Sequence, residues 1–131
     1  MKKGDRVVGF LPNIPEAVVA MLATSSIGAV WSSCSPDFGT NGVLDRFSQI
    51  KPKVIFSADG YQYNGKYHDS LKKLNGILKE LPTVQKVILI NDLKMIDMNS
   101  KAEFIFYNKI LEGTPNPIRF EQLPFDHPLY I

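Results

Sequence analysis

The chain has 131 residues, a length that suits one compact domain with a modest core, and its 44% hydrophobic and 21% charged residues are ordinary for a globular protein. The formal net charge is +2, and the lysines occur in short scattered groups instead of the dense basic stripe that binds nucleic acid. No apolar run reaches the roughly 18 residues of a membrane-spanning helix, so we expect neither nucleic acid nor a membrane as a partner.

The cysteine content and the N-terminus bear on the cellular compartment. The single cysteine, Cys34, excludes an internal disulfide framework and a multi-cysteine zinc site. The first ten residues become charged at Asp5 and Arg6, where a signal peptide would stay apolar. We therefore expect a reducing compartment, the cytosol, and no targeting signal.

The first predicted unit is a strand followed by a helix and a second strand. Residues 6–12 form a short apolar run that ends in proline, and residues 13–28 have the pattern of a helix with Asn13 as its expected cap. The helix interior, residues 17–23, carries no charge, which predicts that this helix packs on both sides. Residues 29–35 return as a second strand.

Predicted helices and strands continue to alternate along the chain. Residues 40–50 have apolar side chains at helical spacing behind Thr40 as a cap, and residues 51–59 follow as an apolar strand. Residues 67–82 form a third helix, and residues 86–92 a strand rich in β-branched side chains. The apolar face of the third helix is formed by Leu71, Leu74, Ile77, Leu78 and Leu81. This order predicts an α/β fold, an open and mostly parallel sheet of about four strands with helices on both faces.

The C-terminal third has weaker signals. Residues 93–104 lack a clear period and are expected to be a surface excursion, whereas residues 104–113 predict a short helix. Residues 114–124 contain three prolines and cannot form long regular structure. Residues 129–131 look like the start of a buried strand with nothing after them, so the chain reads as one partial domain, residues 1–131, of a larger unit.

Residues 31–42, WSSCSPDFGTNG, follow the second predicted strand. In an open α/β sheet the ligand crevice lies beyond the carboxyl ends of the strands, which is the position of this loop. Ser32, Ser33 and Ser35 supply hydroxyl groups, and Pro36 stiffens the turn. Gly39 and Gly42 allow the backbone to approach an anion or a flat ring. No GxGxxG or Walker A pattern occurs, so the residues alone leave a binding loop and a routine connection both open.

The same stretch belongs to a longer part of the sequence that resembles a known protein family. The blocks GDRV, PEAVVAMLA, IGAVWSS, SPDFG, GVLDRFSQI, YNGK and FEQLPFDHPLYI, in this order, resemble the N-terminal domain of the AMP-forming acyl-CoA synthetases, and among them those that act on acetoacetate. The resemblance covers nearly the whole chain and is weakest over residues 93–117. It implies that the chain is part of a larger adenylate-forming N-terminal domain, ending before the phosphate-binding loop of that family.

The resemblance also implies a reaction. Such enzymes use ATP and Mg²⁺ to convert the acid into an acyl-adenylate with release of pyrophosphate, and then transfer the acyl group to the thiol of coenzyme A (CoA). The Ser/Thr/Gly-rich phosphate loop, the acid that binds Mg²⁺, the ribose-binding aspartate and the C-terminal lysine of the family do not occur in this sequence. We therefore expect no catalytic or metal-binding residue here, and a chain that is inactive without the remainder of the ligase.

The resemblance implies a CoA contact. In related acetyl-CoA-forming enzymes, the loop after the second strand and a basic residue after the following strand lie near the nucleotide end of CoA. These places correspond to Ser35, Pro36 and Asp37, and to Lys66. The acetyl-activating enzymes have a phenylalanine and paired glycines where this chain has CSPDF. A solvated surface lysine is the alternative for Lys66.

We expect structural roles for the other side chains that could carry chemistry. Cys34 is expected to be a small core residue, because no histidine is close to it in sequence. His68 and Asp69 are expected in the first turn of the third helix, and His127 in a turn. Trp31 suits core packing or the border of an acyl or pantetheine tunnel.

Two other functions remain open at this stage. The chain could be a small autonomous, flavodoxin-like module that binds a nucleotide or CoA, or a non-catalytic interaction fragment. An autonomous module should have a complete sheet edge, whereas a fragment leaves an apolar face and a strand edge exposed.

Overall fold

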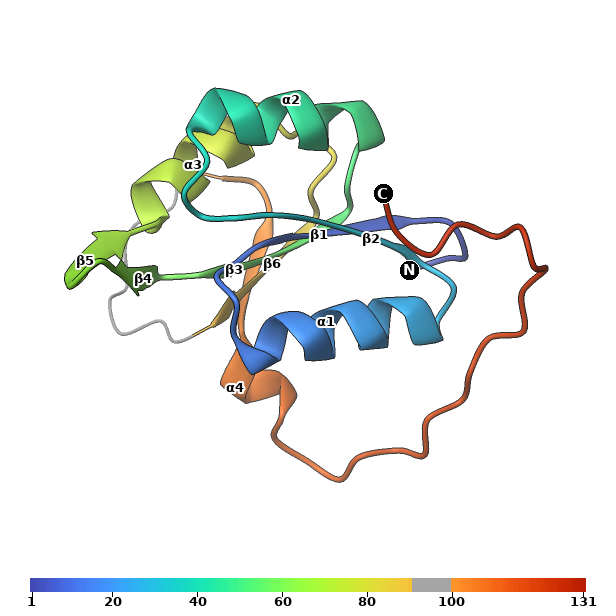
Figure 1. Cartoon of the computed structure of the whole chain (residues 1–131). Coiled ribbons are helices and arrows are strands. Elements are labelled where there is room, and N and C mark those ends of the chain that lie inside the picture. Colours follow the sequence, from blue (N-terminus) through green and yellow to red (C-terminus); the bar gives the residue numbers. More distant parts are fainter. Residues whose placement is uncertain (91–99) are drawn as a thin grey trace.

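The computed structural model describes residues 1–90 and 100–131, and it contains a parallel sheet with helices on both faces (Figure 1). The elements are β1 (Arg6–Phe10), α1 (Pro15–Ser26), β2 (Val30–Cys34), α2 (Thr40–Ile50), β3 (Val54–Ala58), β4 (Gly60–Tyr63), β5 (Lys66–Asp69), α3 (Leu71–Lys79), β6 (Lys86–Ile90), β7 (Glu103–Phe106) and α4 (Tyr107–Ile110). None of the helices in these residues is long and apolar enough to cross a membrane.

The main sheet has the strand order β2-β1-β3-β6-β7, and every pairing in it is parallel. The predicted open parallel sheet is confirmed, but within residues 1–90 and 100–131 it has five strands where about four were expected. The additional strand, β7, lies where a helix over residues 104–113 was predicted. That prediction was wrong for residues 104–106, because a short apolar run has no period that separates a strand from a helix. Only residues 107–110 are helical.

Helices cover both faces of this sheet, as expected (Figure 1). On one face, α2 and α3 bury Val43, Phe47 and Leu74 against Val8 and Ile55 of the central strands. All five apolar positions predicted for the third helix are buried. α1 and α4 cover the opposite face, where a smaller cluster surrounds the ring of Trp31.

The prediction that α1 packs on both sides was wrong. Ala20 and Thr24 face the sheet and are buried, but Val18 is 53% and Leu22 58% exposed. A helix with an uncharged interior can present apolar side chains around its whole circumference, and here one side of it packs on the sheet. The N-cap of α1 is Ile14, one position after Asn13, which was the expected cap. At α2 the N-cap is Gly39, the residue before Thr40.

An antiparallel hairpin, β4–β5, precedes α3 and was not predicted. Its turn residues Asn64 and Gly65 both have positive φ angles, 51° and 74°, as a type I′ turn requires. His68 and Asp69 belong to β5 and not to the first turn of α3, so that expectation was wrong. Asp69 still contacts the start of the helix, because its Oδ1 accepts a hydrogen bond of 2.8 Å from the backbone N–H of Leu71.

The C-terminal segment runs without helix or strand over residues 114–124, as predicted, and returns to the edge of β2 (Figure 1). Tyr130 forms a parallel bridge with Trp31, and the backbone N–H of Ile131 donates to the carbonyl of Trp31 at 2.8 Å. The side chains of residues 129–131 are exposed, not buried. His127 has the structural contact expected of it, because its Nε2 lies 2.9 Å from the carbonyl oxygen of Gly28. Of the expected surface excursion over residues 93–104, residues 93–99 lie outside the described residues.

Candidate functional site

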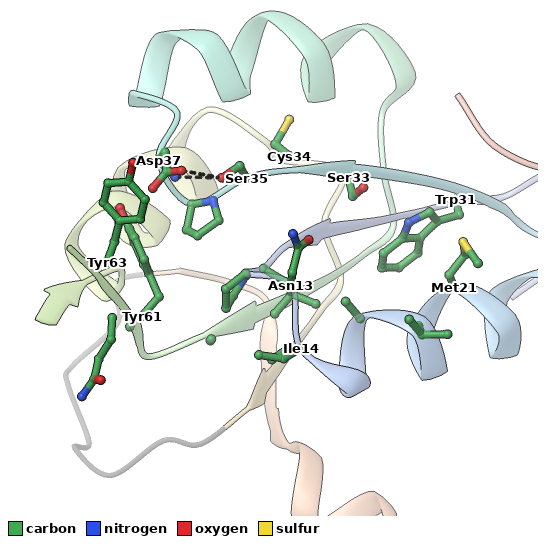
Figure 2. Close-up of a pocket in the computed structure, with 18 residues that line it drawn as sticks. Asn13, Ile14, Met21, Trp31, Ser33, Cys34, Ser35, Asp37, Tyr61 and Tyr63 are labelled. Atoms are coloured by element: carbon green, nitrogen blue, oxygen red, sulfur yellow. Dashed lines mark hydrogen bonds between the residues drawn. The ribbon is translucent and has the colours of Figure 1, made fainter. Parts of the chain in front are cut away.

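A cavity of about 730 Å³ lies at the carboxyl ends of β1, β2 and β3, where an open parallel sheet places its ligand crevice (Figure 2). Three segments form its wall, namely the residues after β1 with the start of α1, the end of β2 with the loop that follows it, and β4. The lining residues are Leu11, Pro12, Asn13, Ile14, Ala17, Val18, Met21, Trp31, Ser33, Cys34, Ser35, Pro36, Asp37, Ala58, Gly60, Tyr61, Gln62 and Tyr63.

The loop after β2 is a fixed turn. The backbone N–H of Phe38 donates to the carbonyl of Ser35 at 3.2 Å, with Pro36 at the second position, where its restricted φ suits a turn. The Ser35 hydroxyl donates to Oδ2 of Asp37 at 3.1 Å (Figure 2). From α3, the ammonium group of Lys73 donates to the carbonyl of Pro36 at 3.2 Å. These bonds hold the Asp37 carboxylate in a defined place beside the cavity.

The hairpin faces this loop. Tyr61 and Tyr63 of β4 lie next to Asp37 at one end of the cavity (Figure 2). Burial raises the pKa of Tyr61, and a hydrogen bond to Asp37 and the negative charge of that carboxylate raise it further. On its other side the Tyr61 ring stacks on His68, with the ring centroids 5.0 Å apart. The raised pKa keeps the Tyr61 hydroxyl protonated at neutral pH, and the contact with His68 packs its ring.

The opposite end of the cavity is apolar. Trp31 is 5% exposed and lies beside Met21 of α1 (Figure 2). Its ring packs on Phe56 with centroids 6.2 Å apart, so it is a core residue, as expected, and it also borders the cavity. A place beside an acyl or pantetheine tunnel stays a prediction. Cys34 is buried in the cluster under α2, as expected of a small core residue, and burial raises the pKa of its thiol. The cavity is thus polar at the loop and hairpin and apolar toward α1.

The structure brings together three of the four residues expected to contact CoA. Ser35, Pro36 and Asp37 are adjacent in the cavity wall. Lys66 is not part of that wall. It lies exposed on β5, paired in register with Tyr63, directly after the hairpin turn. A ligand that reaches Lys66 must therefore extend out of the cavity past Tyr63.

Sequence reasoning missed several residues of this site. Tyr61 and Tyr63 follow the carboxyl end of β3, so the rule that located the loop after β2 applies to them equally. The Asn64–Gly65 pair is a strong hairpin signal, and it would have placed both tyrosines on a strand. The contact between Lys73 and the loop joins residues 37 positions apart, for which the sequence has no local signal.

Among residues 1–90 and 100–131, no group of three or more His, Cys, Asp and Glu side chains is arranged to hold a metal ion.

The chain is similar to known synthetases over its whole length. A family model described as AMP-binding enzyme matches residues 1–131. The chain is 54% identical to acetoacetyl-CoA synthetase from Mus musculus, with 100% of this chain and 20% of the mouse protein covered. It is 48% identical to acetoacetyl-coenzyme A synthetase from Rhizobium meliloti (strain 1021), with 98% of this chain and 20% of that protein covered.

The fold agrees with a solved relative. Acetoacetyl-CoA synthetase from Streptomyces lividans superposes with a TM-score of 0.89 at 45% identity, over 99% of this chain and 20% of that one. The chain thus spans about a fifth of the length of the relatives that it matches. These similarities do not favour a flavodoxin-like module or a non-catalytic interaction fragment. Because the family model matches every residue from 1 to 131, the chain belongs to the AMP-binding enzyme family.

Proposed function

We propose that this chain is part of an ATP-dependent acid–thiol ligase that forms acetoacetyl-CoA from acetoacetate and CoA. The observation that supports the proposal is the identity of about half of all residues with acetoacetyl-CoA synthetases across the chain, in a fold that retains a cavity at the carboxyl ends of its strands. Because the chain spans about a fifth of those relatives, the proposal concerns its contribution to such a ligase.

In the proposed reaction, a carboxylate oxygen of acetoacetate attacks the α-phosphorus of ATP and pyrophosphate leaves. The CoA thiolate then attacks the acyl carbon and AMP leaves. Mg²⁺ would neutralise phosphate charge in the first step. We assign neither Mg²⁺ nor the ATP phosphates to residues of this chain, because the described residues contain no metal-ligand cluster and the sequence has no phosphate-loop motif. We therefore expect no turnover from the chain by itself.

We propose that the contribution of this chain is to bind the nucleotide end of CoA. Ser35, Pro36 and Asp37 form one wall of a cavity of about 730 Å³, a volume that can hold a heterocyclic base. Lys66 is exposed beyond Tyr63 and is placed to pair with a phosphate group outside the cavity. The apolar side of the cavity next to Trp31 suits the aliphatic part of the ligand.

The CoA contact is tested by isothermal titration calorimetry of the chain with CoA. We expect binding that weakens with salt, and about a threefold to tenfold loss of affinity for Lys66→Met, because one phosphate pairing is removed. Lys101→Met is the matched control, since Lys101 is also exposed and lies on the segment before β7. Equal affinities for the wild type and Lys66→Met would remove Lys66 from the site, and no binding of CoA would overturn the proposed CoA site.

The proposed substrate is tested in a chimera. This chain replaces the matching fifth of the Streptomyces lividans acetoacetyl-CoA synthetase, to which it is 45% identical. We expect the chimera to release pyrophosphate in a manner dependent on both acetoacetate and CoA. A folded chimera that activates another acid in preference to acetoacetate would contradict the proposed substrate.

We also propose that the protein is cytosolic, with ATP, acetoacetate and CoA as its small-molecule partners and with no partnership with membranes or nucleic acid. The buried free thiol of Cys34 suits a reducing compartment. Cell fractionation followed by antibody detection checks the location, and recovery in an organelle fraction would contradict it.

A further inference from the structure

Three Asn–Gly pairs occur in the sequence, and the fold places them in three different backbone environments. They are Asn41–Gly42, Asn64–Gly65 and Asn75–Gly76. Asparagine is a chemically labile residue, and a following glycine makes it more reactive, because glycine has no Cβ atom to shield its backbone nitrogen. Since the three pairs share this local chemistry, large differences in reactivity between them must come from the fold.

The reaction open to such a pair is deamidation. The backbone nitrogen of the glycine loses its proton to hydroxide and attacks Cγ of the asparagine. An N–Cγ bond forms, the Cγ–Nδ2 bond breaks, and the side-chain nitrogen takes up a proton and leaves as ammonia. Water then opens the cyclic imide at either carbonyl carbon, which gives aspartate or its β-linked isomer, isoaspartate. The attack requires rotation about ψ of the asparagine, so its rate depends on how firmly the backbone is held.

The backbone of Asn64–Gly65 is held by few contacts. Both residues are exposed, and they form the turn of the β4–β5 hairpin, which is a two-stranded sheet separate from the main one (Figure 1). The last pair of the hairpin ladder is Tyr63 with Lys66, so the turn residues lie outside the ladder. A Cβ atom at Gly65 would meet no atom within 4 Å. Rotation at Asn64 therefore disturbs only the end of a short ladder, which opens locally at low cost.

Asn41–Gly42 combines an exposed asparagine with a helical backbone. Asn41 is exposed, and the pair lies in the first turn of α2. The backbone N–H of Val43 donates to the carbonyl of Gly39 at 3.2 Å, and this bond closes the turn around both residues. The pair therefore separates the effect of backbone conformation from that of exposure.

Asn75–Gly76 is both helical and partly buried. It lies inside α3, where the N–H of Gly76 belongs to the regular series of helical hydrogen bonds. Oδ1 of Asn75 is shielded from solvent, which limits the access of hydroxide and water as well. Rotation at Asn75 requires the opening of a helix that packs on the sheet.

We propose that Asn64 is a site of spontaneous deamidation, and that α2 and α3 protect the other two Asn–Gly pairs from the same reaction. Nothing in this reaction depends on the proposed ligase function, because it needs only the turn and water. The product adds a carboxylate two positions before Lys66 and lowers the formal net charge of +2 by one. Isoaspartate also lengthens the backbone by one methylene group, which a two-residue turn does not accommodate. The reaction therefore changes the hairpin that carries Tyr61 and Tyr63 into the cavity wall.

The test is peptide mapping by mass spectrometry of the folded chain during storage in a mildly alkaline buffer. We expect Asn64 to deamidate at least about tenfold faster than Asn41 and Asn75, because both helical pairs react only when their helix opens. Labelling by an isoaspartate-specific methyltransferase identifies the isomer, which forms through the cyclic imide and not by direct hydrolysis of the amide. Rates that agree within about twofold at the three pairs, or a faster reaction in a helix, would overturn the proposal.

The same chain unfolded in urea is the matched control. With the turn and the helices lost, we expect the three rates to agree within about threefold, because only the neighbouring side chains then differ. A preference for Asn64 that is as large in urea as in the folded chain would contradict protection by the helices. Asn64→Gln removes the reactive side chain, and we expect it to abolish the fast reaction. A fast reaction that remains in this variant would assign the site to another residue.

Discussion

Gly9 lies in the middle of β1 against the ring of Trp31, and it sets how closely that ring approaches the sheet. A Cβ atom at position 9 would stand 2.6 Å from Cζ2 and 2.7 Å from Cη2 of the ring. Gly9→Ala must therefore displace Trp31, and we expect the free energy of unfolding to fall by about 1–3 kcal/mol, the usual cost of overpacking. Urea denaturation followed by circular dichroism measures the loss, and the emission maximum of Trp31 reports the displaced ring.

Gly42→Ala is the control for Gly9→Ala. Gly42 lies inside α2 with its nearest neighbour 4.0 Å away, so the same added methyl group should raise stability by about 0.5–1 kcal/mol through helix propensity. Equal effects of the two substitutions would contradict the assigned contact between Gly9 and Trp31.

A second residue-scale prediction concerns Asp5, at the end of the sheet opposite the cavity. Lys53 Nζ lies 2.8 Å from its Oδ1, and the backbone N–H of Lys2 donates to Oδ2. The hydrogen bond from Lys53 lowers the pKa of Asp5, against the opposing effect of burial. Because the folded pKa lies below the unfolded value of about 3.9, the stabilisation is complete above that value and is lost as the pH falls through the folded pKa.

We therefore expect Asp5→Asn to cost about 1–2 kcal/mol at pH 7 and less at pH 3. Urea denaturation of both proteins at each pH gives the difference. A cost that stays constant or grows as the pH falls would contradict the assigned pairing. Asp45→Asn, on an exposed position of α2, should change stability by less than about 0.5 kcal/mol.

At the scale of elements, α3 supports the loop of the site from behind. The hydrogen bond from Lys73 to the Pro36 carbonyl links this helix to the turn at Ser35–Phe38. Lys73→Met keeps the apolar stem and removes the donor, so the turn loosens, and we expect CoA affinity to fall about threefold to tenfold. Calorimetry with CoA checks this. Lys72→Met removes the same charge from the neighbouring exposed position, and an equal loss there would point to net charge instead.

Some elements of this fold could be predicted from the sequence, and others could not. The alternation of strands and helices, the buried face of α3 and the place of Ser35–Asp37 beyond β2 follow from periodicity and from the geometry of parallel sheets. β7 does not, because four residues are too few to define a period. The approach of Tyr61 to Asp37 depends on how the hairpin folds back over the sheet, a tertiary arrangement that no local pattern contains.

At the scale of the whole molecule, α1, which was expected to pack on both sides, has an exposed apolar side. Val18, Val19 and Leu22 are exposed on the helix, and Ile118, Phe120 and Phe125 are exposed on the extended segment that runs to the edge of β2. Large exposed apolar side chains favour association in water where they form a contiguous patch. We therefore expect the 131-residue chain to self-associate as its concentration rises.

Sedimentation velocity over a range of concentrations measures this association. The double variant with Val18→Lys and Leu22→Lys should remain monomeric at concentrations where the wild type associates. Its free energy of unfolding should change by less than about 0.5 kcal/mol, since both side chains are more than half exposed. Lys79→Met, on the exposed side of α3, is a control that leaves the α1 surface intact. A wild-type chain that stays monomeric throughout would mean that these side chains are too dispersed to act as one surface. Self-association equal in the wild type and the double variant would place the contact elsewhere, on the extended segment or at the β2 edge.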